Sequence, residues 1–572
     1  MSFQRQTAAI LAQLAIVPGI ERLRALTPGG ELSDELLSAI VEEAARLSEE
    51  RLAPFNARSD RSGCTIEGGR VRTSADQRET WAEYVAGGWP TLTASPEHGG
   101  QGLPLLVQAA CEELFNRGST ALMMLATAGR CAARLMAEYA GEEIKAEWLP
   151  RLASGEWGAT ICVSEPDAGS DLARIRTSAE PQPDGSWRVS GEKIWISFGD
   201  HDLSERIGHL VLARTPGAPA GTRGISLFLV PNLIDGAPNG VVVRRIEEKL
   251  GLHASPTCAL GFEQARGRLI GEPHRGLPQM FAMIVAMRIS VGSQGVGIGT
   301  LAAETALDYA FERRQGGSPD APAVPIAEHA DVQRMLLDMT SRVEVVRGLV
   351  LACAACADLA ERETEEAARA EAAALLGWLL PIAKNFSAET GFEAASQAIQ
   401  VLGGAGYTRE WPVEQALRDS RVLAIFEGTS GMQALDLVQR RLLRGGEGLA
   451  AFLRAARRDI AARYATAEAE ALAAVLDTLE AASRQFAAWQ DKPRAVEAGA
   501  YHYLTLASLA ATGWIALRLA GLGGTTPAEQ RIAASGRFWL SDLPARAELE
   551  AQLATAGEQR LSGFSTLRAL HP

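Results

Sequence analysis

Hydrophobic residues recur at helical spacing in two long parts of the chain, and a strand-like pattern lies between them. In residues 31–157 apolar positions return every three or four residues, as in ELLSAIVEEAARLSEERLAPF, which predicts helices broken by Gly and Pro turns. Residues 158–271 hold short β-branched segments such as HLVLAR and GISLFLVP, which predict strands. Helical periodicity returns over 277–444, and an alanine-rich helical block follows Gly445 and Gly446.

This pattern predicts an α+β fold with several domains, because 572 residues are too many for a single hydrophobic core. We expect an antiparallel β domain inserted between helical blocks. The expected segments are an N-terminal extension at 1–30, an N-terminal helical domain at 31–157, a middle β domain at 158–271, a C-terminal helical bundle at 272–444 and an additional helical domain at 445–572.

Charge and hydropathy narrow the possible partners and location. The formal net charge is −13, and binding to nucleic acid phosphates needs a basic surface, so no nucleic acid is expected as a partner. Every apolar run of 18 residues is interrupted by charged or strongly polar residues, so we expect no membrane span. Arg5 and the stretch AAILAQLAIV imitate a signal peptide, but Gln13 interrupts the run and a small-x-small cleavage site does not follow, so we expect an amphipathic helix of a cytoplasmic protein.

The cysteines fit a reducing compartment, because seven in 572 residues is a small and odd number. Cys353 and Cys356 form a C-x-x-C pair, which could be a redox pair or half of a metal site. They lie in the alanine-rich stretch LVLACAACADLA, with neither a second C-x-x-C nor a histidine pair nearby. This setting favours small buried core residues, and we expect no metal site.

A glycine-rich stretch at residues 297–302, GIGTLA, loosely matches a dinucleotide-binding fingerprint. The strand, turn and crossover that such a fingerprint needs are missing around it. Gly292, Gly295 and Gly299 more simply allow two helices to approach closely.

One carboxylate, Glu427, lies directly before a Gly-Thr-Ser turn in RDSRVLAIFEGTSGMQ, residues 418–433. The apolar run at 422–426 is expected to bury the approach to it, and a buried acid is disfavoured in its charged form unless it is used or paired. Glu427 is therefore a candidate general base. The alternative, open from this stretch alone, is a structural glutamate bonded to the free N–H groups of a helix that Thr429 and Ser430 cap.

Three further stretches change this balance: CVSEPDAGSDL at 162–172, GEKIWIS at 191–197 and QVLGGAGYTRE at 400–410. In this order and spacing, and together with the EGTS turn, they resemble the acyl-CoA dehydrogenase flavoprotein family over about residues 32–440. The length of the chain resembles the branch with an extra C-terminal helical domain, which includes enzymes acting on methylthiopropionyl-CoA. The resemblance implies a C-terminal four-helix bundle, an acyl-CoA substrate and a role in fatty acid metabolism.

Oxidising an acyl thioester between Cα and Cβ requires a base for the Cα proton and an acceptor for the Cβ hydride. Side chains do not accept hydride, so FAD is the implied cofactor. The resemblance makes Glu427 the base. Rival branches carry their glutamate directly before a substrate-pocket arginine, and here Met287 precedes that residue, Arg288.

The resemblance also implies residues for the flavin ring and the substrate. Val163 and Ser164 would contact the isoalloxazine edge, Trp195 would pack against the ring and Ser197 would bond near N5. Other implied contacts are Thr429 to the cofactor, Gly169 and Ser170 at the acyl-CoA entrance, and Arg288 and Gly428 to the substrate.

The remaining half of the cofactor is implied to lie against a second subunit, so a homodimer is expected. Arg313 would meet the pyrophosphate with its bidentate fork. Gln400, Gly403 and Gly404 would lie near the adenosine.

The sequence departs from the family pattern at three places. Gly316 stands where an aromatic residue usually follows the E-R-x-x pattern, and Gly431 replaces a polar residue after the EGTS turn. Ile284 and Val285 replace a pair of the Phe-Asp or Asn-Asn type before Arg288, which leaves the CoA contacts and the acyl chain unidentified.

Electron-transferring flavoprotein is the implied electron acceptor, and two alternatives stay open. An acyl-CoA oxidase would use the same base but let O₂ reach the reduced flavin. A DNA-associated relative of the alkylation-response type would concentrate Lys and Arg at the C-terminal end, whereas Lys492 is the only lysine after Arg440.

Overall fold

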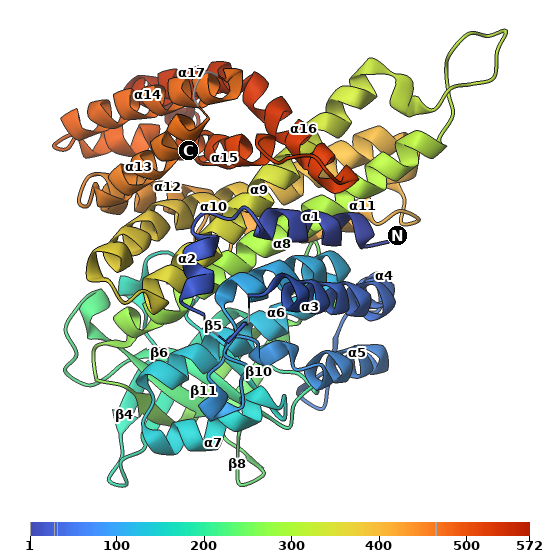
Figure 1. The fold of residues 1–572 in the computed structure, drawn as a ribbon. Helices are drawn as coiled ribbons and strands as arrows, with labels where there is room; N and C mark the ends of the chain where they lie inside the picture. Colours follow the sequence, from blue (N-terminus) through green and yellow to red (C-terminus); the bar gives the residue numbers. More distant parts are fainter. Residues whose placement is uncertain (1, 28, 31, 464–465, 572) are drawn as a thin grey trace. The chain divides into compact units, whose positions relative to one another are not determined.

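The computed structural model describes residues 2–27, 29–30, 32–463 and 466–571, and the chain falls into two compact units (Figure 1). The first unit contains Met1–Ala45, Ala109–Arg117 and Val291–Pro572. The second contains Arg46–Gln108 and Gly118–Ser290. The limits of these units fall inside helices as well as between them.

A seven-stranded sheet forms the centre of the second unit. Six of its strands are hydrogen-bonded in the order β10-β11-β5-β4-β6-β3. The seventh, β7, pairs with both β11 and β6 and so closes a ring of the five strands β11, β5, β4, β6 and β7. The strands are β3 Trp157–Cys162, β4 Ser178–Pro181, β5 Trp187–Ser197, β6 Arg206–Arg214, β7 Ile225–Pro231, β10 Val241–Ile246 and β11 Thr257–Ile270, beside the small ribbons β1 Thr65–Glu67 with β2 Arg70–Arg72 and β8 Leu233–Ile234 with β9 Ala237–Pro238.

The helical–sheet–helical fold class is confirmed, but the sheet is mixed and not wholly antiparallel. β3 pairs with β6 in parallel, from Trp157 opposite Arg206 to Cys162 opposite Val211. A parallel pair needs a long crossover connection. Here β4 and β5 lie between β3 and β6 in the chain and form this crossover, which brings β6 beside β3 in the same direction.

Both faces of the sheet are covered by apolar side chains. Along β6 Leu210 and Leu212 belong to one core cluster, whereas Val211 and Ala213 belong to the other. This separation follows from the period of two in a strand. The first cluster also includes Trp148 of α7. The helices of this unit are α4 Ala53–Ser62, α5 Ala75–Ala86, α7 Glu142–Ala153, most of α6 Leu105–Tyr139 and the start of α8 Gly276–Glu312.

Two histidines of this unit are buried in their neutral form. Burial lowers the pKa of His201 to about 4 and that of His209, on β6, to about 3. Nδ1 of His201 accepts a hydrogen bond from Leu203 N at 3.1 Å, and Nδ1 of His209 lies 2.7 Å from Thr160 Oγ1. In the unfolded chain both rings take up a proton below their ordinary pKa of 6.5.

Acidification is therefore expected to destabilise the protein between about pH 6.5 and pH 4, where the unfolded chain binds protons that the folded protein cannot. At pH 5 the loss is expected to be about 2 kcal/mol per histidine. Urea unfolding at pH 7.5 and pH 5 measures this, and His209→Asn should reduce the pH dependence by that amount. A pH dependence in His209→Asn equal to that of the wild type would contradict the assignment.

The first unit is helical. Its long helices α8, α9 Ala330–Arg362 and α10 Glu366–Leu402 pack side by side, and a series of short helices follows α10. The C-terminal helices cover this bundle, and α15 packs against α9, α10 and α12. The remaining helices are α1 Gln4–Leu14, α2 Ile20–Ala25, α3 Asp34–Leu47, α11 Val413–Ser420, α12 Ser430–Leu435, α13 Glu447–Ala462, α14 Ala467–Ala488, α15 Pro493–Ala520, α16 Pro527–Ser541, α17 Leu543–Thr555 and α18 Phe564–Ala569.

The glycines of α8 permit close helix packing, as predicted. A Cβ at Gly295 would lie 2.1 Å from the carbonyl oxygen of Ser387 on α10, and one at Gly297 would lie 2.6 Å from that of Glu113 on α6. Cys353 and Cys356 are buried on α9 and unbonded to each other, which confirms them as core residues. Burial raises the pKa of Cys356 to about 12, so this thiol is unreactive.

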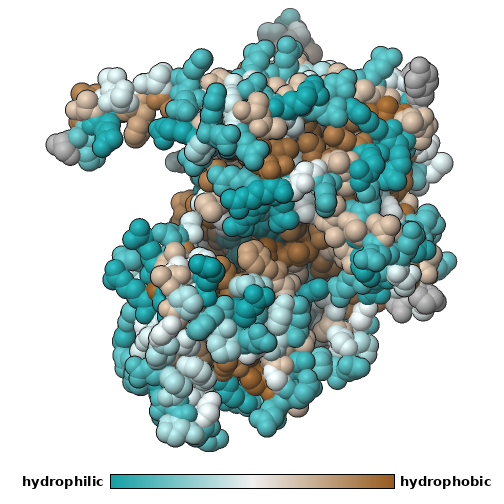
Figure 2. All heavy atoms as spheres, turned by 90° about the vertical axis from the view of Figure 1, so that its left-hand side faces the viewer, coloured by the Kyte–Doolittle hydropathy of each residue, from teal (hydrophilic) through white to brown (hydrophobic). Residues whose placement is uncertain are grey.

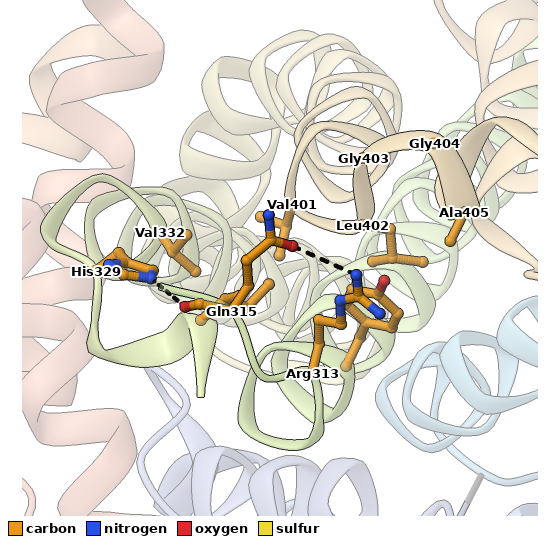
Figure 3. A pocket seen from close by; sticks show the side chains of 11 residues that line it. Arg313, Gln315, His329, Val332, Val401, Leu402, Gly403, Gly404 and Ala405 are labelled. Carbon is orange, nitrogen blue, oxygen red and sulfur yellow. Dashed lines mark hydrogen bonds between the residues drawn. The ribbon is translucent and has the colours of Figure 1, made fainter. Parts of the chain in front are cut away.

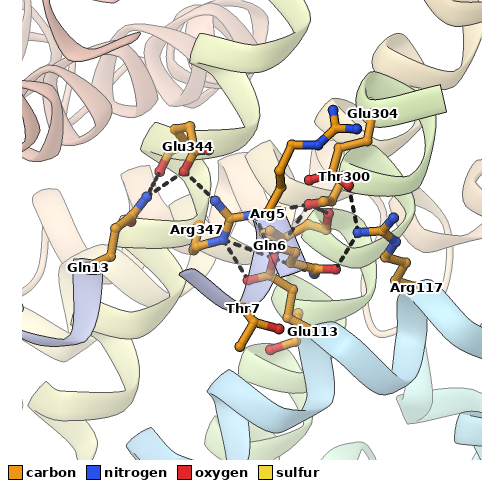
Figure 4. A network of polar contacts seen from close by, with 12 residues as sticks. Arg5, Gln6, Thr7, Gln13, Glu113, Arg117, Thr300, Glu304, Glu344 and Arg347 are labelled. Carbon is orange, nitrogen blue, oxygen red and sulfur yellow. Dashed lines mark hydrogen bonds and ion pairs between the residues drawn. The ribbon is translucent and has the colours of Figure 1, made fainter. Parts of the chain in front are cut away.

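A network of buried charges joins α1, α6, α8 and α9 within this unit (Figure 4). The guanidinium of Arg347 donates through Nε to both oxygens of Glu113, at 2.9 and 3.0 Å, and also pairs with Glu344. Two amides of α1 complete the network: Gln6 Nε2 donates to Glu113 Oε1 and Gln13 Nε2 to Glu344 Oε2, each at 2.7 Å. The N-terminal helix is thus bound to the core by polar contacts.

The pKa values of Glu344 and Arg347 keep both side chains charged. Burial alone would raise the pKa of Glu344, but the charges of Arg347 and Arg531 hold it below its usual value. Burial would likewise lower the pKa of Arg347, but Glu113 and Glu344 raise it above its usual value.

Two helices, Gly276–Glu312 and Pro493–Ala520, are long and apolar enough to cross a membrane by length and composition. In their most apolar windows 72% and 83% of the residues are buried inside the protein, as in core helices. Figure 2 shows one face of the molecule, where hydrophilic residues cover most of the surface and hydrophobic side chains emerge in patches.

Candidate functional site

Glu427 lies in a sharp turn between a short helix, η8 Arg421–Ala424, and α12. Its φ is +55° and that of Gly428 is +93°, so the two residues turn the chain through the left-handed region. Thr429 is the N-cap of α12 and accepts a hydrogen bond from Met432 N at 3.4 Å, which confirms it as a cap residue, whereas Ser430 is the first residue of α12 and donates to Glu389 Oε1 at 2.8 Å. A non-glycine residue at positive φ is uncommon and concentrates at functional sites.

The apolar run before Glu427 does not bury its approach as predicted. Leu423 is buried, but Ile425 is 51% exposed and Glu427 is exposed as well. The reason is local, because η8 ends at Ala424 and the following turn carries the chain back to the surface. The side chain of Glu427 is therefore exposed at the surface of this chain and not enclosed by it.

Two buried side chains that the sequence analysis missed hold this turn. Lys384 Nζ, from α10, donates to the carbonyl oxygens of Leu423 and Gly428, both at 2.9 Å. Gln433 Nε2, from α12, donates to the carbonyl oxygens of Glu427 and Gly428 at 3.0 and 3.2 Å. One signal was available in the sequence: a single lysine in the apolar stretch LLGWLLPIAKNF.

In the second unit, the structure brings Val163, Ser164 and Trp195 together. Ile194 N donates to Ser164 O at 3.0 Å, and Lys193 Nζ donates to Val163 O at the same distance. Trp195 is 59% exposed with φ +63°. It lies where the register between β5 and β11 shifts by a bulge, which re-aims a side chain.

A buried ion pair supports this corner. Lys193 Nζ lies 2.8 Å from Glu165 Oε1, and Glu165 also accepts hydrogen bonds from the backbone N–H groups of Arg176 and Thr177. Burial would raise the pKa of Glu165, but Lys193 and these backbone donors hold it below its usual value. The residues that flank Ser164 are thereby fixed.

The other predicted residues of this unit lie in different settings. Ser197 is half-buried at the end of β5, opposite Thr257. Gly169 and Ser170 lie in an exposed loop, and a Cβ at Gly169 would meet no atom within 4 Å. Arg288 is half-buried on α8.

The position where rival branches place their acid is a core position here. Met287 is buried and belongs to the same apolar cluster as Met283 and Trp148. A carboxylate at Met287 would have to be buried among these side chains.

In the first unit, Arg313, Gly403 and Gly404 line one pocket of about 610 Å³ (Figure 3). Arg313 follows the end of α8, and its Nη2 donates to Gln315 Oε1 at 3.3 Å. Gly403 ends α10 with φ +62°, and neither glycine has an atom within 4 Å of its Cβ position, so the backbone there is open to a ligand. The other lining residues are Tyr309, Gln315, Ile326, His329, Val332, Val401, Leu402 and Ala405.

Gln400 is not among the lining residues. It lies one turn before Gly403 on α10, with an exposed side chain. His329 was not predicted, although it lies directly before α9, and its Nε2 lies 2.8 Å from Gln315 O. The ring of His329 also fills the space beside Gly316, where a Cβ would be 2.8 Å from it.

Among the described residues, groups of three or more His, Cys, Asp or Glu side chains that could hold a metal ion are absent. The exposed surface near the pocket includes large hydrophobic side chains. Tyr407 is 87% exposed and Phe311 61% exposed. The segment between α8 and α9, which carries Arg313, extends away from the helices of its unit (Figure 1).

Comparison with known proteins gives consistent matches along the chain. The models for the N-terminal, middle and C-terminal domains of acyl-CoA dehydrogenase match residues 34–156, 160–265 and 274–443. The 3-methylmercaptopropionyl-CoA dehydrogenase of Ruegeria pomeroyi is 39% identical over 537 residues, covering 90% of this chain and 90% of that protein. A broad-specificity linear acyl-CoA dehydrogenase of Mycobacterium tuberculosis is 34% identical, covering 73% and 72%. The solved acyl-CoA dehydrogenase of Bacillus anthracis complexed with FAD has a TM-score of 0.76 at 20% identity, covering 95% and 92%, and shares the fold.

Proposed function

The chain belongs to the acyl-CoA dehydrogenase family, and from this premise we propose that it desaturates an acyl-CoA thioester between Cα and Cβ with Glu427 as base. FAD, the cofactor of this family, would supply the hydride acceptor when bound. The single observation that carries the proposal is an exposed glutamate in a left-handed turn, with its backbone held by buried donors. Strained backbone positions of this kind cluster at functional sites.

The proton of Cα is transferred to a carboxylate oxygen of Glu427, which is exposed and therefore accessible to a substrate. Gly428 would contact the thioester region through its backbone, and Arg288 would lie in the substrate pocket. Gly169 and Ser170 would line the entrance for the CoA part, since their loop is exposed and open at Gly169.

The described residues fit a flat aromatic cofactor in the second unit. Trp195 offers an exposed ring, and the backbone of Val163 and Ser164 is fixed beside it. We assign these three residues to the isoalloxazine ring, with Ser197 near N5 and Thr429 as a further contact. Aromatic packing and hydrogen bonds would orient the ring for hydride transfer.

The pocket around Arg313 fits the adenosine diphosphate part of FAD bound by a second copy of the chain. It combines a guanidinium with two glycines whose backbone is open, and both features suit phosphate groups. Gln400, near the end of α10, would contact the adenosine part of FAD. Exposed Tyr407 and Phe311 beside this region support a homodimer, and light scattering that finds a monomer retaining FAD would contradict it.

Replacing Arg313 by alanine is expected to weaken FAD binding by about 2 kcal/mol, or roughly 30-fold, because it removes charge-assisted hydrogen bonds to phosphate. Lysine should restore only part of the affinity, since it lacks the bidentate fork. Fluorescence titration of the apoprotein with FAD measures the dissociation constant.

Arg314→Ala is the matched control, because Arg314 is the next residue, lies outside the pocket lining and donates to Ala323 O. It should bind FAD like the wild type. Equal affinities of Arg313→Ala and Arg314→Ala would make Arg313 a surface charge.

Anaerobic bleaching of the bound flavin by a panel of CoA esters tests the function. The panel should include 3-methylmercaptopropionyl-CoA, after the relative named for it, together with straight-chain esters. A protein that binds no FAD, or that no ester bleaches, would refute the proposal. We propose electron-transferring flavoprotein as the acceptor, in a cytoplasmic enzyme, and rapid reoxidation of the reduced enzyme by O₂ would indicate an oxidase instead.

A further inference from the structure

The side chain of Lys384 is fully buried in the apolar middle of α10. A buried ammonium group is unfavourable unless hydrogen bonds replace its hydration. Its donors point to two carbonyl oxygens that flank the turn of Glu427: that of Leu423, at the end of η8, and that of Gly428, both at 2.9 Å. The same ammonium lies 5.8 Å from the ring centre of Phe426. Lys384 therefore bridges the chain on both sides of Glu427.

Gln433 provides a second anchor from α12. It is buried, and its Nε2 donates to the carbonyl oxygens of Glu427 and Gly428. A Cβ at residue 428 would lie 2.7 Å from the same nitrogen, and φ is +93° there, so this position requires glycine. Lys384 and Gln433 together hold three carbonyl oxygens of the turn, those of Leu423, Glu427 and Gly428.

The anchors decide where the carboxylate of Glu427 points. Its φ of +55° lies about 120° from the value that a residue with a side chain prefers. Because the side chain is exposed, burial contributes little to holding this conformation. If φ relaxed to its usual value, the carboxylate would move by a distance of several C–C bonds. A misplacement of about 1 Å can already lower a catalytic rate by about 100-fold.

We propose that Lys384 and Gln433 are positioning residues of the dehydrogenation: they hold Glu427 in the left-handed conformation that presents its carboxylate to Cα. This inference rests on the proposed role of Glu427 as base. Neither residue touches the substrate in this scheme, and each acts on the rate through the backbone of Glu427.

The test is stopped-flow reduction of the FAD-loaded enzyme by its best CoA ester. Lys384→Met keeps the length of the side chain and removes its donors, and it should lower the limiting rate about 100-fold while FAD content and the concentration of ester for half-maximal rate stay unchanged. Lys384→Arg should recover part of the rate, because it keeps a charged donor. Lys145→Met, at a surface pair with Glu142 on α7, should behave as the wild type.

A double-mutant cycle separates positioning from a general structural effect. In the Glu427→Gln background Lys384→Met should cause no further loss, because the group it positions has already been removed. Rate losses that multiply in the double variant would overturn the proposal. So would a Lys384→Met enzyme that reduces its flavin as fast as the wild type.

Gln433→Met tests the same inference through the second anchor and should also lower the rate with FAD content retained. If neither variant folds with FAD, the anchors are requirements of the fold and the positioning role is refuted. If no ester bleaches the wild-type flavin, the proposed function fails and the inference fails with it. A fast wild type with fast anchor variants refutes the positioning role alone.

Discussion

Glu427→Gln is expected to lower the rate of flavin reduction by about 10⁴-fold or more, at or beyond the upper end of the range for general bases. Glutamine keeps the size and hydrogen-bonding shape of the side chain but lacks the basic lone pair that accepts the Cα proton. FAD content and the free energy of unfolding should stay near the wild-type values, because the side chain is exposed.

Stopped-flow absorbance under anaerobic conditions measures this rate. Glu410→Gln is a suitable control, since Glu410 is an exposed glutamate in the neighbouring QVLGGAGYTRE stretch and has no assigned role. If Glu427→Gln bleaches its flavin at the wild-type rate, Glu427 is a helix-capping residue and the base lies elsewhere.

Arg347→Met is expected to lower the free energy of unfolding by about 3–5 kcal/mol, the loss typical of removing one partner from a buried ion pair. Arg347 lies between two carboxylates, those of Glu113 and Glu344, and all three side chains are buried. Its removal leaves both buried carboxylates without the guanidinium that lies between them.

Urea unfolding at pH 7.5 measures the loss. Arg334→Met is the control on the same helix, because Arg334 pairs with Asp331 at the exposed surface, and it should cost about 1 kcal/mol or less. Glu113→Gln added to Arg347→Met should recover part of the stability by removing one stranded charge. A loss below about 1 kcal/mol for Arg347→Met would mean that water enters the network and solvates its carboxylates.

The features that the sequence predicted are local in the chain. The EGTS turn, the cap at Thr429 and the strand that carries Trp195 each depend on fewer than about a dozen neighbouring residues, where backbone propensity and capping rules apply. The close packing at Gly295 was predictable for the same reason, since the spacing of small residues in one helix is visible in its sequence. The parallel pairing of β3 with β6 was not predictable in this way, because it depends on the topology of the chain.

The features that were missed join residues far apart. Lys384 is 44 residues from Gly428, and Arg347 is 234 residues from Glu113. A helical pattern does not tell a charged residue facing solvent from one facing a buried partner. Glu344 and Arg347 follow the polar spacing of a surface helix, although both lie in the core. The exposure of Ile425 and Glu427 was missed because it depends on where η8 ends.

The amides of Gln6 and Gln13 have a practical consequence for anyone who shortens this protein. The family match begins only at residue 34, so a chain cut to that limit would look complete by homology. Such a chain would lose the two donors that α1 provides to Glu113 and Glu344, and also the carbonyl of Ile16 that accepts from Arg518. Glu113 and Glu344 are buried and would lose these hydrogen bonds, so domain limits taken from sequence matches are the wrong guide for designing a minimal version.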